Sequence, residues 1–287
     1  MSKKRVLITG AAGYISSQLL PIFRDRYELV LLDSQKQGRE GVIEDIIEVD
    51  LSNPDIESYR HHFQGIDAVV HNARISRPGL KSNAPVQWLD ARPPNNVDSY
   101  YPERDSLDMA FHVFKLAMEE NIGRVVVASS NHATDWYEST IHSGEKRMIG
   151  PETYPKSDNF YGWTKAAYEH MGFVFATGRF GKAVENVHIR IGAPRTIDGE
   201  KLHSNPTSYR RNLGAYFSPR DMCQLYIKSI ETVDIKNSDG IPHQIFYGIS
   251  DNTRAFWSLD NAREVVGYAP EDDSEQVFAD EIEKYLT

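Results

Sequence analysis

The chain has 287 residues, of which 40% are hydrophobic and 25% are charged, so its composition is that of an ordinary globular protein. Its formal net charge of -9 at pH 7 argues against a nucleic-acid partner, because no basic face remains to neutralise phosphates. The single cysteine, Cys223, permits no internal disulfide, and no apolar run is long enough to cross a bilayer. The composition therefore predicts a soluble, cytoplasmic protein without a nucleic-acid or membrane partner.

Short apolar runs alternate with helical stretches over the first third of the chain. We expect strands at 6–8, 29–32, 46–49 and 68–70, and helices at 14–26 and 55–63. Continuous Val, Ile and Leu runs separated by helices are typical of a parallel sheet covered on both faces. Pro21 is expected to kink the first helix, because proline removes a helical hydrogen bond.

The same alternation continues through the rest of the chain. We expect helices at 107–120, 161–175 and 220–232, and strands at 124–127, 187–191 and 245–247. Two stretches, 77–105 and 193–217, show no clear periodicity, and both follow the carboxyl ends of expected strands. Ligands bind at that edge of open α/β sheets, so we interpret these stretches as covers of a site, with ordinary surface loops as the alternative.

The first strand leads into a glycine-containing turn, Thr9–Gly13, that is typical of a dinucleotide-binding site. Gly10 permits the tight turn, and Gly13 lets the backbone approach a pyrophosphate. The helix then begins at Tyr14 and Ile15, where free N–H groups and the helix dipole favour an anion. The spacing is Gly-x-x-Gly-x-x-Ser, with a small residue in place of the third glycine.

Residues at the ends of the next strands fit NAD. Asp33 ends the second strand, where a carboxylate accepts the ribose hydroxyls of NAD and repels the 2′-phosphate of NADP. Asp50 and Leu51 follow the third strand toward the adenine, and Asn72 and Ala73 follow the fourth toward the ribose. The sequence therefore predicts NAD as the cofactor. Use of NADP stays open because two cations follow Asp33 closely, Lys36 and Arg39.

Tyr161 and Lys165 lie four residues apart at the start of an expected helix, so their side chains share one helix face. A free tyrosine has a pKa of about 10, and a nearby ammonium and the positive charge of the nicotinamide favour the phenolate. Ser130 ends the fifth strand, where its hydroxyl can hold the reacting oxygen beside the tyrosine. We therefore assign catalysis to Ser130, Tyr161 and Lys165, with Asn131 and His132 as candidates to bind substrate hydroxyls. No second ligand stands at metal-binding spacing beside His132, so we expect no metal.

Together these motifs resemble the extended short-chain dehydrogenase/reductases of the NAD-dependent epimerase/dehydratase family, over nearly the whole chain. Within that superfamily the chain is most similar to the uronate dehydrogenases and to related aldose and sugar-phosphate dehydrogenases. The segments that carry this finer resemblance are Ala128–His132, Ile189–Gly192, and Tyr247–Thr253 with Trp257.

The resemblance implies oxidation at C1 of a cyclic sugar acid to a lactone, with NAD as the acceptor. By position, the residues that match substrate contacts are Ser76, Ser130, Asn131, His132 and Tyr161. The residues that match further cofactor contacts are Arg74, Tyr161, Lys165 and Ile191. Arg211 is similar to the arginine that binds the sugar carboxylate, with Arg210 as the alternative if the loop shifts by one residue.

Three departures leave the identity of the substrate open. Ser106 and Met109 stand where the family has asparagine and glycine, and Arg74 replaces a small residue beside the cofactor. The segment 77–105 is also longer than in uronate dehydrogenases.

The expected fold is α/β: a Rossmann-like, doubly wound parallel sheet with a small C-terminal substrate-binding portion. Residues 1–192 would form the NAD-binding domain that carries the Ser/Tyr/Lys set, and residues 193–287 the substrate-binding portion. The leading functional hypothesis is a dehydrogenase of a small sugar or sugar acid. The alternatives are an epimerase or dehydratase with tightly bound NAD and a catalytically silent NAD-binding protein. The short C-terminal portion favours the first, and the complete Ser/Tyr/Lys set disfavours the last. A homo-oligomer stays open.

Overall fold

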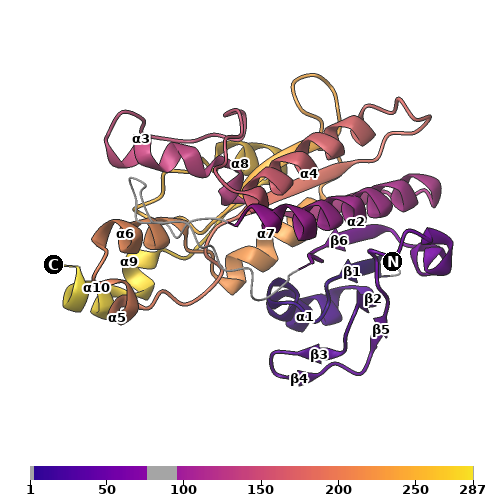
Figure 1. The fold of residues 1–287 in the computed structure, drawn as a ribbon, viewed down its shortest axis with the longest axis horizontal. Helices are drawn as coiled ribbons and strands as arrows, with labels where there is room; N and C mark the ends of the chain where they lie inside the picture. The colour runs from indigo at the N-terminus through magenta and orange to yellow at the C-terminus, as the bar shows by residue number, and fades with distance from the viewer. Residues whose placement is uncertain (1–2, 76–95, 287) are drawn as a thin grey trace.

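The computed structural model describes residues 3–75 and 96–286; Ser76 and most of the expected cover 77–105 lie outside the described residues. Seven strands form one sheet in the order β5-β2-β1-β6-β7-β8-β9, and every neighbouring pair is parallel (Figure 1). Their bounds are Arg5–Thr9 (β1), Glu28–Asp33 (β2), Ile46–Glu48 (β5), Ala68–His71 (β6), Arg124–Ser130 (β7), Asn186–Ile191 (β8) and His243–Gly248 (β9). Each strand expected from the sequence is present.

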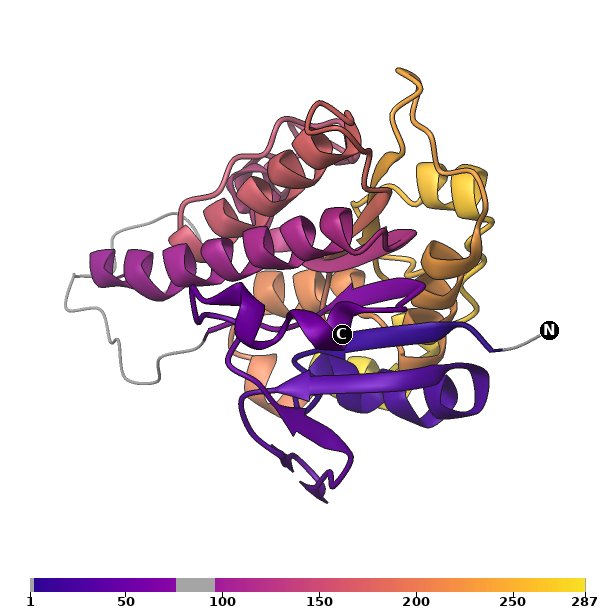
Figure 2. The same cartoon turned by 90° about the vertical axis from the view of Figure 1, so that its right-hand side faces the viewer.

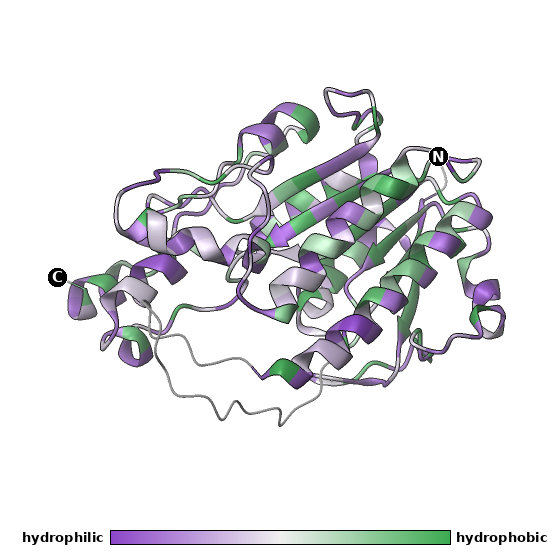
Figure 3. Cartoon of the chain, turned by 45° about the horizontal axis from the view of Figure 1, so that its top comes forward, coloured by the Kyte–Doolittle hydropathy of each residue, from purple (hydrophilic) through white to green (hydrophobic). Residues whose placement is uncertain are grey.

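Two pairs of long helices cover the two faces of the sheet. Helices α1 (Tyr14–Arg26) and α7 (Pro219–Glu231) pack together on one face, and α2 (Tyr100–Glu119) and α4 (Phe160–Ala176) on the other, as Figures 1 and 2 show. Each face has its own apolar core, and Figure 3 shows hydrophobic residues concentrated along the central strands. The doubly wound α/β fold expected from the sequence is therefore confirmed.

Shorter elements lie at the edges of this framework. A two-stranded antiparallel hairpin follows β2, with β3 at Gln37–Gly38 and β4 at Gly41–Val42. The short helices α5, α6, α9 and α10 gather at one end of the molecule near the C-terminus (Figure 1). The remaining bounds are Ile56–Ser58 (η1), Arg60–Phe63 (η2), Val97–Ser99 (η3), Asn131–Tyr137 (η4), Glu138–His142 (α3), Gly199–Leu202 (α5), Pro206–Ala215 (α6), Asp260–Val266 (α8), Ser274–Val277 (α9) and Ala279–Tyr285 (α10). Within the described ranges, no helix combines the length and apolarity needed to span a membrane.

Three local expectations differ from the structure. The segment 55–63 forms two 3-10 turns rather than one helix, and they are separated at Tyr59, which has φ -127°. Helix α2 begins at Tyr100 rather than 107, because Pro102 falls in its first turn, where a missing N–H costs no hydrogen bond. The stretch 193–217 contains α5 and α6 and is not a structureless loop. Helix α1 has the bounds expected from the sequence and contains Pro21, and the kink expected there stays a prediction.

A buried polar network joins α4 to the sheet. Glu169 and Arg190 form a paired ion bridge, with Nε to Oε1 and Nη2 to Oε2 distances that are both 2.8 Å. The Ser129 hydroxyl donates to Glu169, and Arg190 donates to the Tyr247 hydroxyl, which in turn lies 3.1 Å from Thr134 Oγ1. All five residues are buried, so the network fixes the position of α4 against β7, β8 and β9.

Replacement of Arg190 by Met should destabilise the fold strongly, because it leaves the Glu169 carboxylate buried without its cation. We expect a loss of about 3–5 kcal/mol in the free energy of unfolding, measured by chemical denaturation. The matched control is Arg24→Gln, which breaks the exposed pair with Asp45 and should cost about 0–1 kcal/mol. Equal losses for the two variants would show that the buried pair does not anchor α4.

Candidate active site

The turn between β1 and α1 is tight and pressed against the end of β6. Gly10 has φ +67°, and a Cβ built on it would lie 2.6 Å from the backbone nitrogen of Ala73. Only glycine satisfies both constraints. Gly13 is the N-cap of α1 without a capping side chain, and the first turn holds no acidic residue. The N–H groups of Tyr14 and Ile15 therefore stand at a helix end suited to a pyrophosphate, which fits NAD.

Asp33 reaches across to this turn from the end of β2. Its Oδ2 accepts a hydrogen bond from the Ala12 N–H at 3.0 Å, and its Oδ1 accepts one from the Gln35 N–H at 3.2 Å. The side chain is half-buried, and nearby the Arg39 guanidinium stacks on the Tyr14 ring at 4.0 Å. Asp33 thus supports the turn and still presents a carboxylate where the sequence predicts a ribose contact.

Other expected cofactor residues lie along the same edge of the sheet. Asn72 is fixed by hydrogen bonds with Ser16 and Tyr226, and Ala73 N donates to Thr9 Oγ1 at 3.4 Å. Asp50 closes a turn by accepting two hydrogen bonds from Ser52, and it is exposed. The two remaining positions, both buried, are Leu51 and Ile191.

Helix α4 approaches β7 closely at its first turn. Asn159 caps the helix by accepting the Gly162 N–H at 2.8 Å. A Cβ at Gly162 would lie 2.1 Å from the carbonyl oxygen of His132, so a larger residue would push the helix away from the end of β7. The glycine directly after Tyr161 is therefore what allows the tyrosine to stand beside Ser130.

The structure brings Ser130, Tyr161 and Lys165 together at the carboxyl end of β7. Lys165 is buried, and its Nζ donates to the Ala128 carbonyl at 2.7 Å. This nitrogen lies 5.7 Å from the ring centroid of Tyr161 and 4.5 Å from that of Tyr168. Ser130 Oγ also accepts the His132 N–H at 3.2 Å, which orients the hydroxyl group at the strand end.

Burial dominates the protonation of both titrating residues. It raises the pKa of Tyr161, whereas hydrogen bonding by Ser130 and the charge of Arg74 act in the opposite direction. Burial, and to a smaller extent the charge of Arg74, lowers the pKa of Lys165 to about 7. The sequence expectation that the lysine ammonium brings the tyrosine pKa down is therefore not met in the protein alone, because desolvation outweighs the neighbouring charges.

A chain of polar contacts extends from Tyr161 toward α6. The His132 ring packs at 5.5 Å from the Tyr161 ring and shares a 2.6 Å hydrogen bond with Asp135. Arg211 lies 3.9 Å from Asp135 and donates twice to Glu138 Oε1, at 2.8 and 3.0 Å. Arg211 thus stands on a helix, not on a loop, and is paired with a carboxylate.

The neighbouring side chains complete this substrate end. Arg210 is exposed, so the two arginines differ sharply in their surroundings. Asn131 is buried, and neither atom of its amide has a hydrogen-bond partner among the described residues. An unsatisfied buried amide is costly, so a ligand at this position is a natural partner for it.

The sequence reasoning missed the ion pair between Arg74 and Glu103. The Arg74 guanidinium carbon lies 4.5 Å from the ring centroid of Tyr161, and Glu103 comes from the first turns of α2. Arg74 stood out as a departure from the family, but no signal marked Glu103 as its partner. No cluster of three or more potential metal ligands occurs in residues 3–75 and 96–286.

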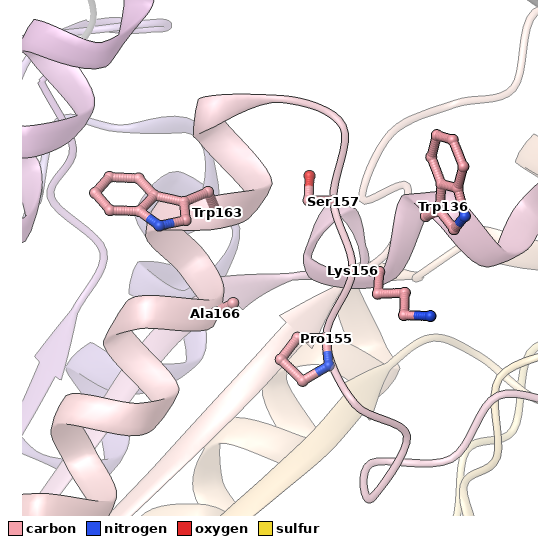
Figure 4. A pocket seen from close by; sticks show the side chains of 6 residues that line it. All are labelled: Trp136, Pro155, Lys156, Ser157, Trp163 and Ala166. Carbon is pink, nitrogen blue, oxygen red and sulfur yellow. The ribbon is translucent and has the colours of Figure 1, made fainter.

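A cavity of about 270 Å³ lies beside the start of α4 and is separate from this site. Trp136 and Trp163 stand on its two sides (Figure 4). Its lining contains none of the expected catalytic residues; the side chains that line it are Trp136, Pro155, Lys156, Ser157, Trp163 and Ala166. The cavity therefore does not alter the assignment of the site.

A parallel sheet of this order, with an anion-binding turn after β1 and a Ser/Tyr/Lys group at β7 and α4, defines a Rossmann-type oxidoreductase that binds a nicotinamide dinucleotide. The sequence profile of the NAD dependent epimerase/dehydratase family matches residues 6–179, and the chain belongs to this family. Membership confirms the expected class of enzyme and the expected cofactor, NAD.

Relatives with assigned activities match over nearly the whole chain. It is 30% identical over 279 residues to the NAD-dependent glucose-6-phosphate dehydrogenase of Haloferax volcanii, covering 94% of both proteins. It is 26% identical over 275 residues to the uronate dehydrogenase of Pseudomonas syringae pv. tomato, covering 94% of this chain and 83% of that protein. A mutant uronate dehydrogenase from Agrobacterium tumefaciens, solved with NAD, superposes with a TM-score of 0.71 at 21% identity, over 100% of this chain and 91% of that one, which shows the shared fold.

Replacement of Asp33 by Asn tests its role in cofactor choice. The amide oxygen can still accept the Ala12 N–H, but the charge that would repel the NADP phosphate is gone. The ratio of kcat/KM with NAD to that with NADP should fall by about 10- to 100-fold, measured by reduction of each cofactor. Asp25→Asn, an exposed change at the far end of α1, is the control. Wild-type turnover with NADP equal to that with NAD would contradict the assignment.

Proposed function

We propose that the chain is a dehydrogenase that oxidises the C1 hydroxyl of a small cyclic sugar or sugar acid, such as a uronate, to a lactone. The observation that carries this proposal is the grouping of Ser130, Tyr161 and Lys165 at the end of β7, beside the glycine turn for NAD. The full-length similarity to a sugar-phosphate dehydrogenase and to a uronate dehydrogenase supports the choice of substrate class.

In this mechanism Tyr161 accepts the proton of the C1 hydroxyl, and Ser130 holds the same oxygen by a hydrogen bond. Bound NAD supplies the acceptor for the hydride that leaves C1. Lys165 lies one turn further along α4, with its Nζ 5.7 Å from the ring centroid of Tyr161, where its charged form favours the phenolate. Asn131 and His132 face the same end of β7 and are the residues we assign to the other sugar hydroxyls, with Ser76 as a further candidate from the sequence resemblance.

The chain of polar contacts that begins at Tyr161 ends at an arginine, Arg211, which could bind an anionic group of the substrate. Arg211 donates to Glu138 through Nε and Nη2, which leaves Nη1 without a hydrogen bond to the described residues. It also lines a cavity of about 210 Å³ with Arg210, Arg254, His142 and Phe256. Guanidinium groups of this kind suit a carboxylate or a phosphate, which supports a sugar acid or a sugar phosphate over a neutral aldose.

Purified protein with NAD, incubated separately with uronates, neutral aldoses and hexose phosphates, tests the proposed reaction by NADH absorbance. Net formation of NADH with one of these sugars supports a dehydrogenase. Conversion of a sugar without net NADH would replace the proposal with an epimerase or dehydratase that keeps its NAD bound. Binding of NAD without conversion of any sugar would favour a silent NAD-binding protein.

Replacement of Tyr161 by Phe should abolish most turnover while preserving the packing of the ring. Loss of the general base should lower kcat by about 10²- to 10⁴-fold, with NAD affinity close to that of the wild type by calorimetry. Tyr154→Phe, which changes an exposed tyrosine, should leave kcat unchanged. Wild-type turnover in Tyr161→Phe would rule out the proposed base.

Replacement of Arg211 by Gln tests recognition of an acidic sugar. The KM for such a substrate should rise by about 10- to 100-fold, while a neutral aldose, if it is turned over, should be little affected. Because the change removes the ion pair between Arg211 and Glu138, the double variant with Glu138→Gln serves as the control for loss of structure. A similar rise in KM for both kinds of sugar would show that Arg211 does not read the acid group.

A further inference from the structure

An ion pair stands between the end of β6 and α2, directly beside the base. Arg74 lies three residues after the end of β6, and its Nη2 pairs with Glu103 Oε1. The Glu103 side chain is only 3% exposed, and its Oε2 has no hydrogen-bond partner among the described residues. A carboxylate buried to this degree is normally held by a cation, and Arg74 is that cation.

Neighbouring hydrogen bonds fix the position of this ion pair relative to α4. The Ile75 N–H donates to Ser106 Oγ at 3.1 Å, which ties the residue after Arg74 to α2. The Tyr168 hydroxyl donates to the Ser106 carbonyl at 3.0 Å, which ties α4 to the same turn. The segment that carries Arg74, the helix that carries Glu103 and the helix that carries Tyr161 are thus joined at one serine.

The guanidinium of Arg74 is placed over the ring of the base. Its central carbon lies 4.5 Å from the Tyr161 centroid, closer than Lys165 Nζ at 5.7 Å. Arginine stays charged at any working pH, whereas burial lowers the pKa of Lys165 to about 7. Near neutral pH, Arg74 is therefore the more constant positive charge beside the phenol.

We propose that Arg74 is a positioning residue for the base, whose guanidinium, fixed by Glu103, stabilises the Tyr161 phenolate that accepts the substrate proton. The proposal rests on the assignment of Tyr161 as the base. It explains why an arginine stands where the resembling family has a small residue. Glu103 then sets the strength of the effect, because its negative charge opposes that of Arg74 at the phenol.

The charged and titratable groups around Tyr161 come from each element packed against it. They are Arg74 after β6, Glu103 on α2, His132 and Asp135 on η4, and Lys165 and Tyr168 on α4. Among them, Arg74 lowers the pKa of Tyr161, and Glu103 and Asp135 raise it. Removal of either member of the ion pair should therefore move the tyrosine titration, and the two removals should move it in opposite directions.

Tyrosine labelled with carbon-13 at Cζ reports this titration without any turnover. The signal that is missing in Tyr161→Phe identifies the base, and its pH titration is followed by NMR in the full-length protein. We expect Arg74→Gln to raise the pKa of Tyr161 by about 1–2 units, and Glu103→Gln to lower it by about one unit. Arg74→Lys should keep most of the wild-type value, because it retains a charge. The control is Arg104→Gln, which removes an exposed arginine on α2 and should shift nothing.

The rate measured on the loaded enzyme should follow the same pattern. The alkaline rise of kcat should move to higher pH in Arg74→Gln and to lower pH in Glu103→Gln, with the plateau largely retained. Titrations that shift in the same direction in both variants, or not at all, would overturn the proposal. So would an increase in KM in Arg74→Gln with an unmoved titration, which would make Arg74 a ligand-binding residue instead.

Failure of the proposed function is recognised separately from failure of this inference. If no sugar is oxidised, the NMR titration still shows whether Arg74 acts on Tyr161. If sugars are oxidised and the titration does not move, only the role of Arg74 is wrong. Should Arg74→Gln not fold, Glu103→Gln and Arg74→Lys give the same test, because they predict a downward shift and a retained value respectively.

Discussion

The buried pair between Glu169 and Arg190 is the interaction on which the site depends. Tyr161, Lys165 and Glu169 are spaced four residues apart, so they lie along one face of α4. Because Glu169 is paired with Arg190, a buried residue of β8, the helix cannot rotate without breaking two charged hydrogen bonds in the core. The orientation of the base is thus set two turns away from it.

Two glycines allow the close backbone contacts that bring the cofactor turn and the catalytic helix to the site. Gly162 lets α4 contact the backbone of His132, and Gly10 lets the cofactor turn contact the backbone at Ala73. The first contact brings Tyr161 to the end of β7, and the second fixes the residue immediately before Arg74. Close backbone packing at the two glycines therefore brings the base and its neighbouring cation close together, and the buried ion pair holds the orientation of the base.

Local patterns were enough to predict the framework of the molecule. Buried Val and Ile runs marked the seven strands, and the spacing of Tyr161 and Lys165 placed both on one helix face. The ion pairs could not be predicted from local patterns, because Glu103 is 29 residues from Arg74 and Glu138 is 73 residues from Arg211 in the sequence. Only the folded chain brings each pair together. The start of α2 at Tyr100 was not predicted, because Pro102 and its neighbours have the composition of a loop. Proline is nevertheless acceptable in the first turn of a helix.

The titrating residues of the site are held toward their neutral forms, whereas its arginines stay charged. Burial holds Tyr161 and Lys165 toward their neutral forms, so neither brings a stable charge into the core at rest. The guanidinium groups keep their charge, and each is balanced by a carboxylate of its own: Arg74 by Glu103 and Arg211 by Glu138. An arginine paired with a carboxylate avoids the desolvation cost of a lone buried cation. A negative charge that forms beside such a pair still interacts most strongly with the closer of the two charged groups. At Tyr161 the arginine has the larger effect on the pKa of the two, and its guanidinium carbon lies 4.5 Å from the ring centroid. The arrangement can therefore remain close to neutral while Tyr161 is protonated and still favour the phenolate, the form that accepts the substrate proton.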